Sequence, residues 1–183
     1  SLHSFKCLLA QFGLEIFDAH LSTIHGGSCV AYVSRKNIHA STLRLEELLY
    51  EEQQNGVDKV GLYKNFAANS QKQKIILQQL ISGIKSSGKK IQALGAPVKG
   101  STIVNFCGLD ERHIDCAVEI NPHKFETYIP GTKIPVLDEA KAEKPDVYLL
   151  LAWNFAEEIL PRFEKFRASG GQFLVPIPTP KLI

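Results

Sequence analysis

The pattern of apolar and polar positions changes near residue 89. Before it, apolar residues recur at helical spacing over residues 4–12, 42–54 and 63–86. Two extended stretches, around residues 14–19 and 30–33, lie on either side of the turn His25-Gly26-Gly27-Ser28. The first part of the chain is therefore predicted to be a helix and a β-hairpin, followed by helices that break near Asn55-Gly56.

After residue 89, short apolar runs alternate with helical segments. Runs over residues 91–94, 114–120, 147–152 and 173–176 are apolar on both faces, which is typical of parallel strands covered on each side. We expect an α/β fold: a Rossmann-like, open and mostly parallel sheet with helices on both faces, preceded by the helix and hairpin and by a long connecting helix. Asn154 is the predicted N-cap of the helix that follows the third run, and Pro161 is expected to kink or restart that helix.

The octapeptide Gly-Ala-Pro-Val-Lys-Gly-Ser-Thr at residues 95–102 follows a predicted strand and opens a predicted helix. Backbone N–H groups at such a helix start, with the helix dipole, bind anions without a special side chain. Other unusual residues also follow strands, Asn121 and Lys124 after the second and Trp153 and Asn154 after a later one. Because ligands of open α/β sheets bind at the carboxyl ends of strands, a phosphate-bearing ligand is predicted there.

Two known phosphate patterns nearly match this turn. Gly95 and Gly100 have the outer spacing of the dinucleotide fingerprint, with Pro97 at the middle glycine, and Glu119 stands where a ribose-binding acid belongs. They also have the outer spacing of a P-loop, but Ser101 occupies the place of the lysine. A glycine-tightened turn without a ligand explains the same residues.

Composition excludes several classes of protein. With 44% hydrophobic and 22% charged residues and a net charge of +2, the chain is an ordinary globular sequence, and bulk charge gives no support for nucleic-acid binding. It has no apolar run long enough for a membrane helix and no signal peptide, so a cytoplasmic location is expected. The four cysteines form no CxxC pair, so no metal site is expected. The absence of methionine favours a piece of a longer protein.

Seven blocks, taken together, carry a family resemblance across essentially the whole chain, at residues 13–16, 25–28, 95–102, 130–135, 144–146, 152–154 and 170–178. In order and spacing they resemble the C-terminal region of bacterial nucleotide-sugar C-methyltransferases. The resemblance implies a Rossmann-like C-terminal domain that helps to hold a nucleotide-linked keto-deoxysugar, commonly a dTDP-sugar. It also implies a central domain that binds S-adenosylmethionine and an N-terminal domain that binds zinc, both outside this chain.

The resemblance implies a division of the chain into three parts. Residues 1–36 would end the catalytic methyltransferase domain, residues 37–88 would be a helical connector, and residues 89–183 would be the nucleotide-sugar-binding domain. The family's active-site histidine motif would lie upstream of Ser1. The expected partners are the nucleotide-sugar and the missing domains, with no nucleic acid and no membrane.

Site residues follow from the same blocks. Lys99, Gly100 and Ser101 would lie at the phosphates, and the loop from His25 would face the catalytic domain, with His25 as the candidate proton-transfer residue in this chain. Two departures from the family bear on specificity: Phe-Glu-Thr at residues 125–127 replaces a Gln-Gly-Arg type run, and Lys133 replaces a histidine. The candidate substrate-binding residues are Gly26, Gly27, Ser28, Gly95, Lys99, Gly100, Ser101, Glu119, Asn121, Lys124, Lys133, Trp153 and Asn154.

Two other functions remain open from the sequence. One is an NAD(P)-type dinucleotide-binding domain of an oxidoreductase, which the glycine spacing and Glu119 favour. The other is a non-catalytic interaction module, which the departures after Lys124 favour. Titration with NAD, NADP and dTDP distinguishes the three hypotheses.

Overall fold

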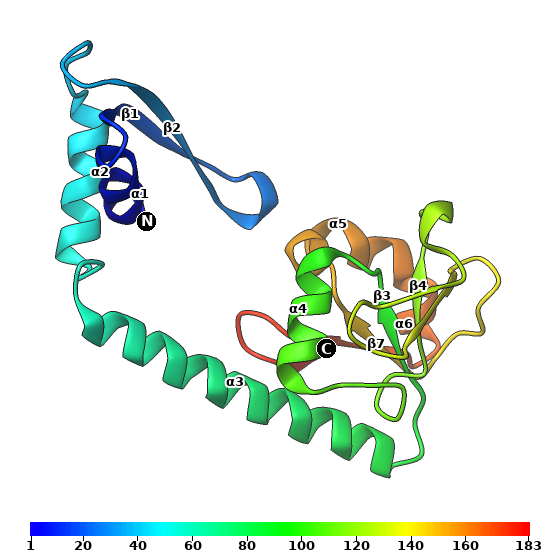
Figure 1. Cartoon of the computed structure of the whole chain (residues 1–183). Coiled ribbons are helices and arrows are strands. Elements are labelled where there is room, and N and C mark those ends of the chain that lie inside the picture. Colours follow the sequence, from blue (N-terminus) through cyan, green and yellow to red (C-terminus); the bar gives the residue numbers. More distant parts are fainter. The chain divides into compact units, whose positions relative to one another are not determined.

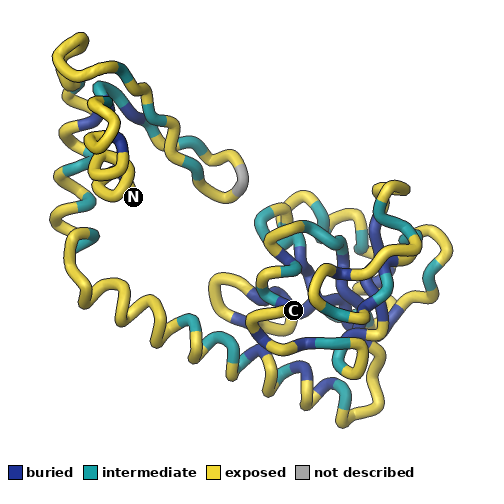
Figure 2. Tube along the Cα trace, in the orientation of Figure 1, coloured by how far each residue is buried: buried dark blue, intermediate teal, exposed yellow. Residues whose placement is uncertain are grey.

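A computed structural model describes residues 1–24 and 26–183. Internal contacts divide the chain into two compact units, Ser1–Asn69 and Ser70–Ile183. Each unit has a hydrophobic core of its own, seen as buried segments in Figure 2. The long helix α3 (Val60–Ser86) crosses the boundary between the units. The functional assignment of residues 1–36, 37–88 and 89–183 stays a prediction.

The first unit is an antiparallel hairpin with two helices packed against one face, shown in blue and cyan in Figure 1. Its main core residues are Leu2, Leu9, Ile16, Ala19 and Leu45. Thr42 caps the second helix by accepting the N–H of Leu45. The elements in chain order are α1 (Leu2–Ala10), β1 (Leu14–Ser22), η1 (Ile24–Gly26), β2 (Ser28–Arg35) and α2 (Leu43–Gln54).

The second unit contains a seven-stranded sheet in the order β5-β6-β4-β3-β7-β8-β9. The five inner strands, from β6 to β8, are parallel, and β5 and β9 pair antiparallel at the two edges. The predicted mostly parallel sheet is thus confirmed. The strands are β3 (Ile91–Leu94), β4 (Cys116–Glu119), β5 (Thr127–Tyr128), β6 (Pro135–Asp138), β7 (Val147–Leu150), β8 (Gln172–Val175) and β9 (Lys181–Leu182).

Helices cover both faces of this sheet. On one face, Leu77 and Ile81 of α3 and Val104 of α4 (Val98–Cys107) pack with alternate strand residues. On the other face, a chain of short helical turns buries an aromatic cluster around Tyr148 and Phe173. These turns are η3 (Trp153–Phe155), α5 (Ala156–Ile159), η4 (Leu160–Phe163) and α6 (Glu164–Ala168). Strands β3, β4 and β7 are buried along their whole length, which explains their continuous apolar runs.

The segment after β7 differs from the sequence prediction. Asn154 lies inside η3, and Phe155, which precedes α5, makes no side-chain capping bond. The prediction that Asn154 is the N-cap is therefore wrong, because the chain turns through a 3-10 helix before the α-helix begins. Pro161 occupies the first turn of η4, so the predicted restart of the helix is confirmed. No helix in the described part of the chain is long and apolar enough to cross a membrane.

Candidate functional site

The carboxyl ends of the parallel strands bring most of the predicted site residues to one edge of the sheet, which we call the carboxyl edge. Gly95 follows β3, Glu119 ends β4, and Trp153 follows β7. These three strands are neighbours in the order β4-β3-β7. The chain leaves β3 through α4 and leaves β7 toward the helices of the opposite face, so the strand order switches between them. This switch is the position at which open α/β sheets bind ligands.

The turn before α4 is set by backbone geometry. Gly95 has φ +80°, a left-handed conformation that favours glycine. Its N–H donates to the carbonyl of Val118, 2.8 Å away, which ties the turn to β4. Pro97 is the N-cap of α4 and offers no side-chain acceptor to the first helical N–H groups. At this helix start the N-cap residue therefore makes no side-chain capping bond.

Gly100 allows α4 to approach the end of β7. A Cβ added at Gly100 would lie 2.8 Å from the Cβ of Leu151, a fully buried residue. The glycine of the motif is thus required for packing of the helix against the sheet, as is the third glycine of dinucleotide fingerprints. Lys99 and Ser101 flank it in the first turn, Lys99 exposed and Ser101 half-buried.

Glu119 is buried, and hydrogen-bond donors of the protein occupy the acceptor positions of its carboxylate. Oε1 accepts the N–H groups of Ile120 at 2.9 Å and Asn121 at 3.2 Å. Oε2 accepts the N–H of Ala96 at 3.2 Å and the ammonium of Lys124 at 2.9 Å. A carboxylate offers about four acceptor positions, two on each oxygen. No acceptor is left for the two hydroxyls of a ribose, which argues against the dinucleotide hypothesis.

The ionisation of Glu119 follows from these contacts. Burial raises the pKa of the carboxyl, but the hydrogen bonds from Lys124, Ala96, Asn121 and Ile120 outweigh burial and hold the pKa below its usual value. Glu119 is therefore ionised near neutral pH, and its acceptor positions are taken by donors of the protein. The Lys124 ammonium also donates to the carbonyl of Ala96 at 3.1 Å, so two of its three N–H donors are in use.

The remaining residues of the carboxyl edge have structural contacts as well. Asn121 caps the short helix η2 (Pro122–Lys124), its Oδ1 accepting the N–H of His123 at 3.1 Å. Trp153 packs, partly buried, against the aromatic core below the sheet. Asn154 is half-buried beside it in η3. These side chains lie near the helix start of α4 because they follow neighbouring strands.

Lys133 lies at the opposite end of the sheet. It precedes β6, so it is at the amino ends of the parallel strands, next to the loop that leads from α4 to β4. There Lys133 and Thr132 line an open groove with Asp110 and Arg112. The structure does not bring Lys133 together with Lys99 and Ser101. The sequence resemblance could not show this, because it orders the blocks without assigning them to an edge.

The glycine turn of the hairpin lies in the first unit. Gly26, Gly27 and Ser28 line an open, mostly apolar groove, and Ser28 Oγ donates to the carbonyl of Ile24 at 2.9 Å. The candidate proton-transfer residue His25 lies outside the described residues. The loop and the carboxyl edge belong to different units.

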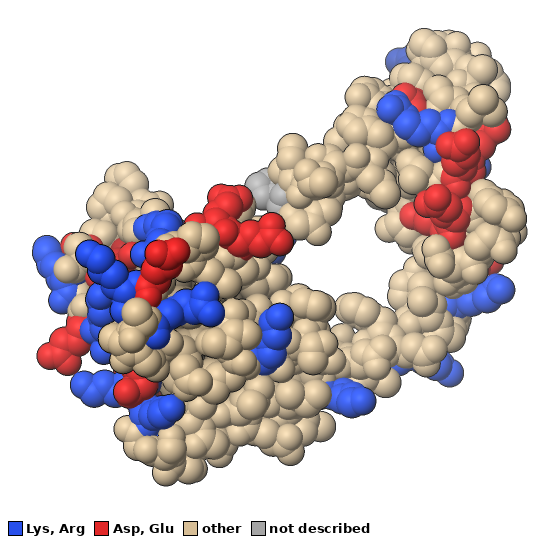
Figure 3. Space-filling view, turned by 180° about the vertical axis from the view of Figure 1, so that it is seen from behind, with Lys and Arg blue, Asp and Glu red and all other residues tan. Residues whose placement is uncertain are grey.

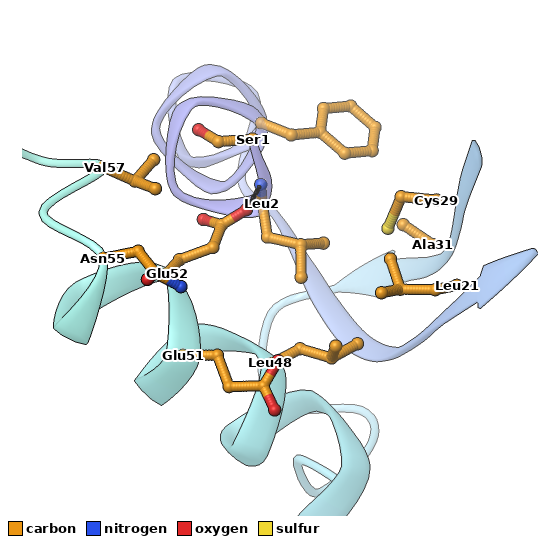
Figure 4. A pocket seen from close by; sticks show the side chains of 11 residues that line it. Ser1, Leu2, Leu21, Cys29, Ala31, Leu48, Glu51, Glu52, Asn55 and Val57 are labelled. Atoms are coloured by element: carbon orange, nitrogen blue, oxygen red, sulfur yellow. Dashed lines mark hydrogen bonds between the residues drawn. The ribbon is translucent and has the colours of Figure 1, made fainter. Parts of the chain in front are cut away.

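Another cavity in the first unit was not predicted. A pocket of about 360 Å³ lies between α1, α2 and the hairpin. Figure 4 shows Leu2, Leu21 and Leu48 pointing into this space, with the Glu52 carboxylate at one side. Glu52 accepts the N–H groups of Leu2 at 2.7 Å and His3 at 2.8 Å, which fixes the first turn of α1. Because the Glu52 carboxylate is used in this way, the pocket offers a chiefly hydrophobic lining.

Among the described residues, neither the distribution of charge nor the arrangement of metal-binding side chains indicates a further site. Figure 3 shows lysine and arginine mixed with acidic residues on the second unit, while the acidic residues of the first unit include those of α2. Among residues 1–24 and 26–183, no group of three or more His, Cys, Asp or Glu side chains is placed to hold a metal ion. The mixed charge matches the small net charge of the sequence.

Comparison with known proteins identifies the family. The family described as the C-methyltransferase C-terminal domain matches residues 23–178. The chain belongs to the C-methyltransferase family. It is also similar to the C-methyltransferase NovU of Streptomyces niveus, with 34% identity over 186 aligned positions that cover 100% of this chain. The chain spans 44% of the length of NovU. The family expected from the sequence is thus confirmed, and the matched region includes the whole carboxyl edge.

Proposed function

We propose that this chain is the substrate-binding part of a cytoplasmic, S-adenosylmethionine-dependent C-methyltransferase that acts on a nucleotide-linked keto-deoxysugar. The carboxyl edge of the second unit would bind the nucleotide-sugar pyrophosphate, and dTDP is the preferred nucleotide. The observation that carries this proposal is the start of α4 at the carboxyl edge, where the N-cap Pro97 makes no capping bond and Lys99 and Ser101 flank Gly100 in a C-methyltransferase domain.

The glycine turn at residues 95–97 does not favour the methyl donor. The glycine turn at residues 95–97 has one neighbouring acid, Glu119, and its acceptors are filled by protein donors. Glu119 therefore has no free acceptor for the ribose hydroxyls of an adenosyl group. We assign the donor site, the zinc site and the main catalytic histidines to the rest of the full-length protein. No chemical step is assigned to Glu119.

We further propose that the hairpin completes the catalytic domain of the full-length enzyme. One face of the hairpin packs on α1 and α2, but its strands and turn still expose large apolar side chains. Those on the strands and turn include Leu21, Ile24 and Tyr32, which are 66%, 61% and 43% exposed. The C-terminal family match begins at residue 23, after β1, so α1 and β1 lie before it. The rest of the catalytic domain would cover these residues, which would place the loop containing His25 beside it.

Calorimetric titration of the full-length protein with dTDP and with NAD tests the ligand. We expect saturable dTDP binding that weakens about tenfold in Lys99→Ala, because a charge near a phosphate is lost, and no change in Lys133→Ala at the opposite edge. Tight NAD binding with no dTDP binding would support the dinucleotide hypothesis. Binding of neither nucleotide would leave the interaction module as the better explanation.

A further inference from the structure

The Gly95–Pro97 turn is connected to the loop after β4 by an ion pair that crosses the carboxyl edge. We propose that Glu119 and Lys124 are positioning residues that hold Ala96 from both sides and thereby fix the direction of the α4 start, instead of contacting the ligand as the sequence suggests. The ligand part of this inference rests on the function proposed above. The contact with Ala96 is independent of it.

The geometry places both backbone groups of one residue in the contact. The N–H of Ala96 donates to Glu119 Oε2 at 3.2 Å, and its carbonyl accepts from Lys124 Nζ at 3.1 Å. The same ammonium donates to Glu119 Oε2 at 2.9 Å. The three groups therefore close a ring of hydrogen bonds around a single residue. No other acceptor or donor for Ala96 is needed, because both its main-chain groups are satisfied.

Several observations favour positioning over direct contact for Glu119. Its side chain is 10% exposed, and all its acceptor positions are occupied, two of them by the N–H groups of Ile120 and Asn121. A carboxylate would also repel a pyrophosphate at close range. The charge of Lys124 offsets this repulsion, and its side chain is 40% exposed, so one ammonium proton remains for water or ligand. Direct contact by Lys124 is thus the alternative that an experiment has to distinguish.

The position of Ala96 determines where the helix begins. Only Pro97 separates Ala96 from Val98, the first residue of α4, and the proline ring restricts φ, here −77°. On the other side, Gly95 is held by its hydrogen bond to Val118. Fixing Ala96 therefore leaves little freedom in the direction of the first N–H groups of α4. A binding site whose donors are already oriented loses less entropy when a ligand binds.

Three variants test the inference, each measured first without ligand. Lys124→Met removes the ammonium but leaves the three backbone bonds of Glu119, and Glu119→Gln keeps the shape but removes the charge. Lys133→Met is the matched control at the opposite edge. We expect amide hydrogen exchange at Ala96 to rise about tenfold or more in the first two variants and to stay unchanged in the control. Fluorescence of Trp153 in a thermal melt checks that each variant is folded.

Binding and kinetics then separate the two roles. In the full-length protein, we expect Lys124→Met and Glu119→Gln to weaken dTDP binding by about tenfold and to raise KM for the nucleotide-sugar with kcat retained. Simple loss of folded enzyme would instead lower the apparent kcat and leave KM unchanged. If Lys124→Met weakens dTDP binding while exchange at Ala96 stays as in the wild type, Lys124 contacts the ligand and the positioning role is refuted.

Failure of the inference and failure of the proposed function give different results. Unchanged exchange at Ala96 in both variants refutes the positioning role whatever the ligand is. Increased exchange at Ala96, with no dTDP binding by the wild-type full-length protein, supports the contact and refutes the nucleotide-sugar assignment. If Glu119→Gln fails to fold, Lys124→Met still decides the outcome, because it removes no acceptor from the backbone.

Discussion

Replacing Gly100 with alanine is expected to destabilise the second unit, although alanine is the better helix former. Gly100 is buried in α4, where the new methyl group would lie 2.8 Å from Cβ, 3.1 Å from Cδ1 and 3.3 Å from Cγ of Leu151. The Cβ contact cannot be relieved by rotating the leucine side chain. The helix must move away from β7, or Leu151 must shift within a closely packed core.

The magnitude follows from two opposing effects. Exchange of glycine for alanine inside a helix stabilises by up to about 1 kcal/mol. Forcing an extra methyl group into a packed core costs about 1–3 kcal/mol. Gly83 of α3 isolates the first effect, because a Cβ at Gly83 would meet no atom within 4 Å. We therefore expect Gly83→Ala to be stabilising, and the two variants to differ by about 1–3 kcal/mol in free energy of unfolding.

Urea unfolding followed by tryptophan fluorescence measures this difference. Trp153 is the only tryptophan of the chain and packs against the core of the second unit. Both glycines lie in that unit, so one signal serves both variants. The slopes of the two unfolding curves should agree, which shows that the denatured state is unchanged. If Gly100→Ala stabilises as much as Gly83→Ala, the close approach of α4 to Leu151 is not limiting and the packing argument fails.

Three further predictions concern other parts of the chain. Hydrogen bonds, above all from Arg44, lower the pKa of Asp18 from 3.8 to about 2, so its contribution to stability is complete above pH 4 and is lost as pH falls toward 2. An NMR titration should show this pKa, and Arg44→Ala should raise it. Gly131→Ala would place a Cβ 2.2 Å from Asn105 Oδ1, so the exposed Asn105 side chain would have to move and give up its hydrogen bonds to the carbonyls of Ser101 and Pro130. The free energy of unfolding should fall by about 1 kcal/mol more than in Gly108→Ala, which shares the left-handed φ but meets no atom within 4 Å. Equal losses would refute the clash. Burial raises the pKa of the Cys116 thiol to about 11 and that of the Cys107 thiol above its usual value. A disulfide reagent should therefore modify only the exposed Cys7 and Cys29 quickly in the folded protein, and all four thiols after unfolding.

The core of the second unit could be predicted because its strands are buried on both faces. Continuous apolar runs identify β3, β4, β7 and β8 without knowledge of their partners. Local signals likewise mark helix ends, such as Thr42 before α2 and Gly108, with φ +64°, after α4. These features depend on neighbouring residues alone, so the sequence contains them.

The edge strands could not be predicted in the same way. Strand β6 has an exposed residue, Leu137, and β5 and β9 are two residues long. Their extended conformation depends on pairing with distant strands, and short exposed segments give no period to detect. In the structure β6 begins at Pro135, the last residue of the block at residues 130–135.

The site shows a similar division. The sequence placed Gly95, Glu119 and Trp153 at strand ends, and the sheet order then brings them to one edge. It could not show that the acceptors of Glu119 are filled, because one donor is Ala96 in the loop after β3 and another is the Lys124 ammonium, which reaches back from η2. Nor could it separate Lys133, since the two ends of a strand are only a few residues apart along the chain but lie at opposite edges.

The position of β3 in the sheet has a consequence for biosynthesis. The first strand of the second unit to leave the ribosome is also its central one: Gln92 lies opposite Cys116 of β4 on one side and Tyr148 of β7 on the other. While the intervening segment is being translated, one side of β3 has hydrogen-bonding groups without their native neighbour. A nascent chain stalled before Val147 would expose a bare apolar edge that invites pairing with other chains. Because the first strand of this unit is the central one, pairing of β7 with β3 is the step that covers this edge and protects the chain from aggregation.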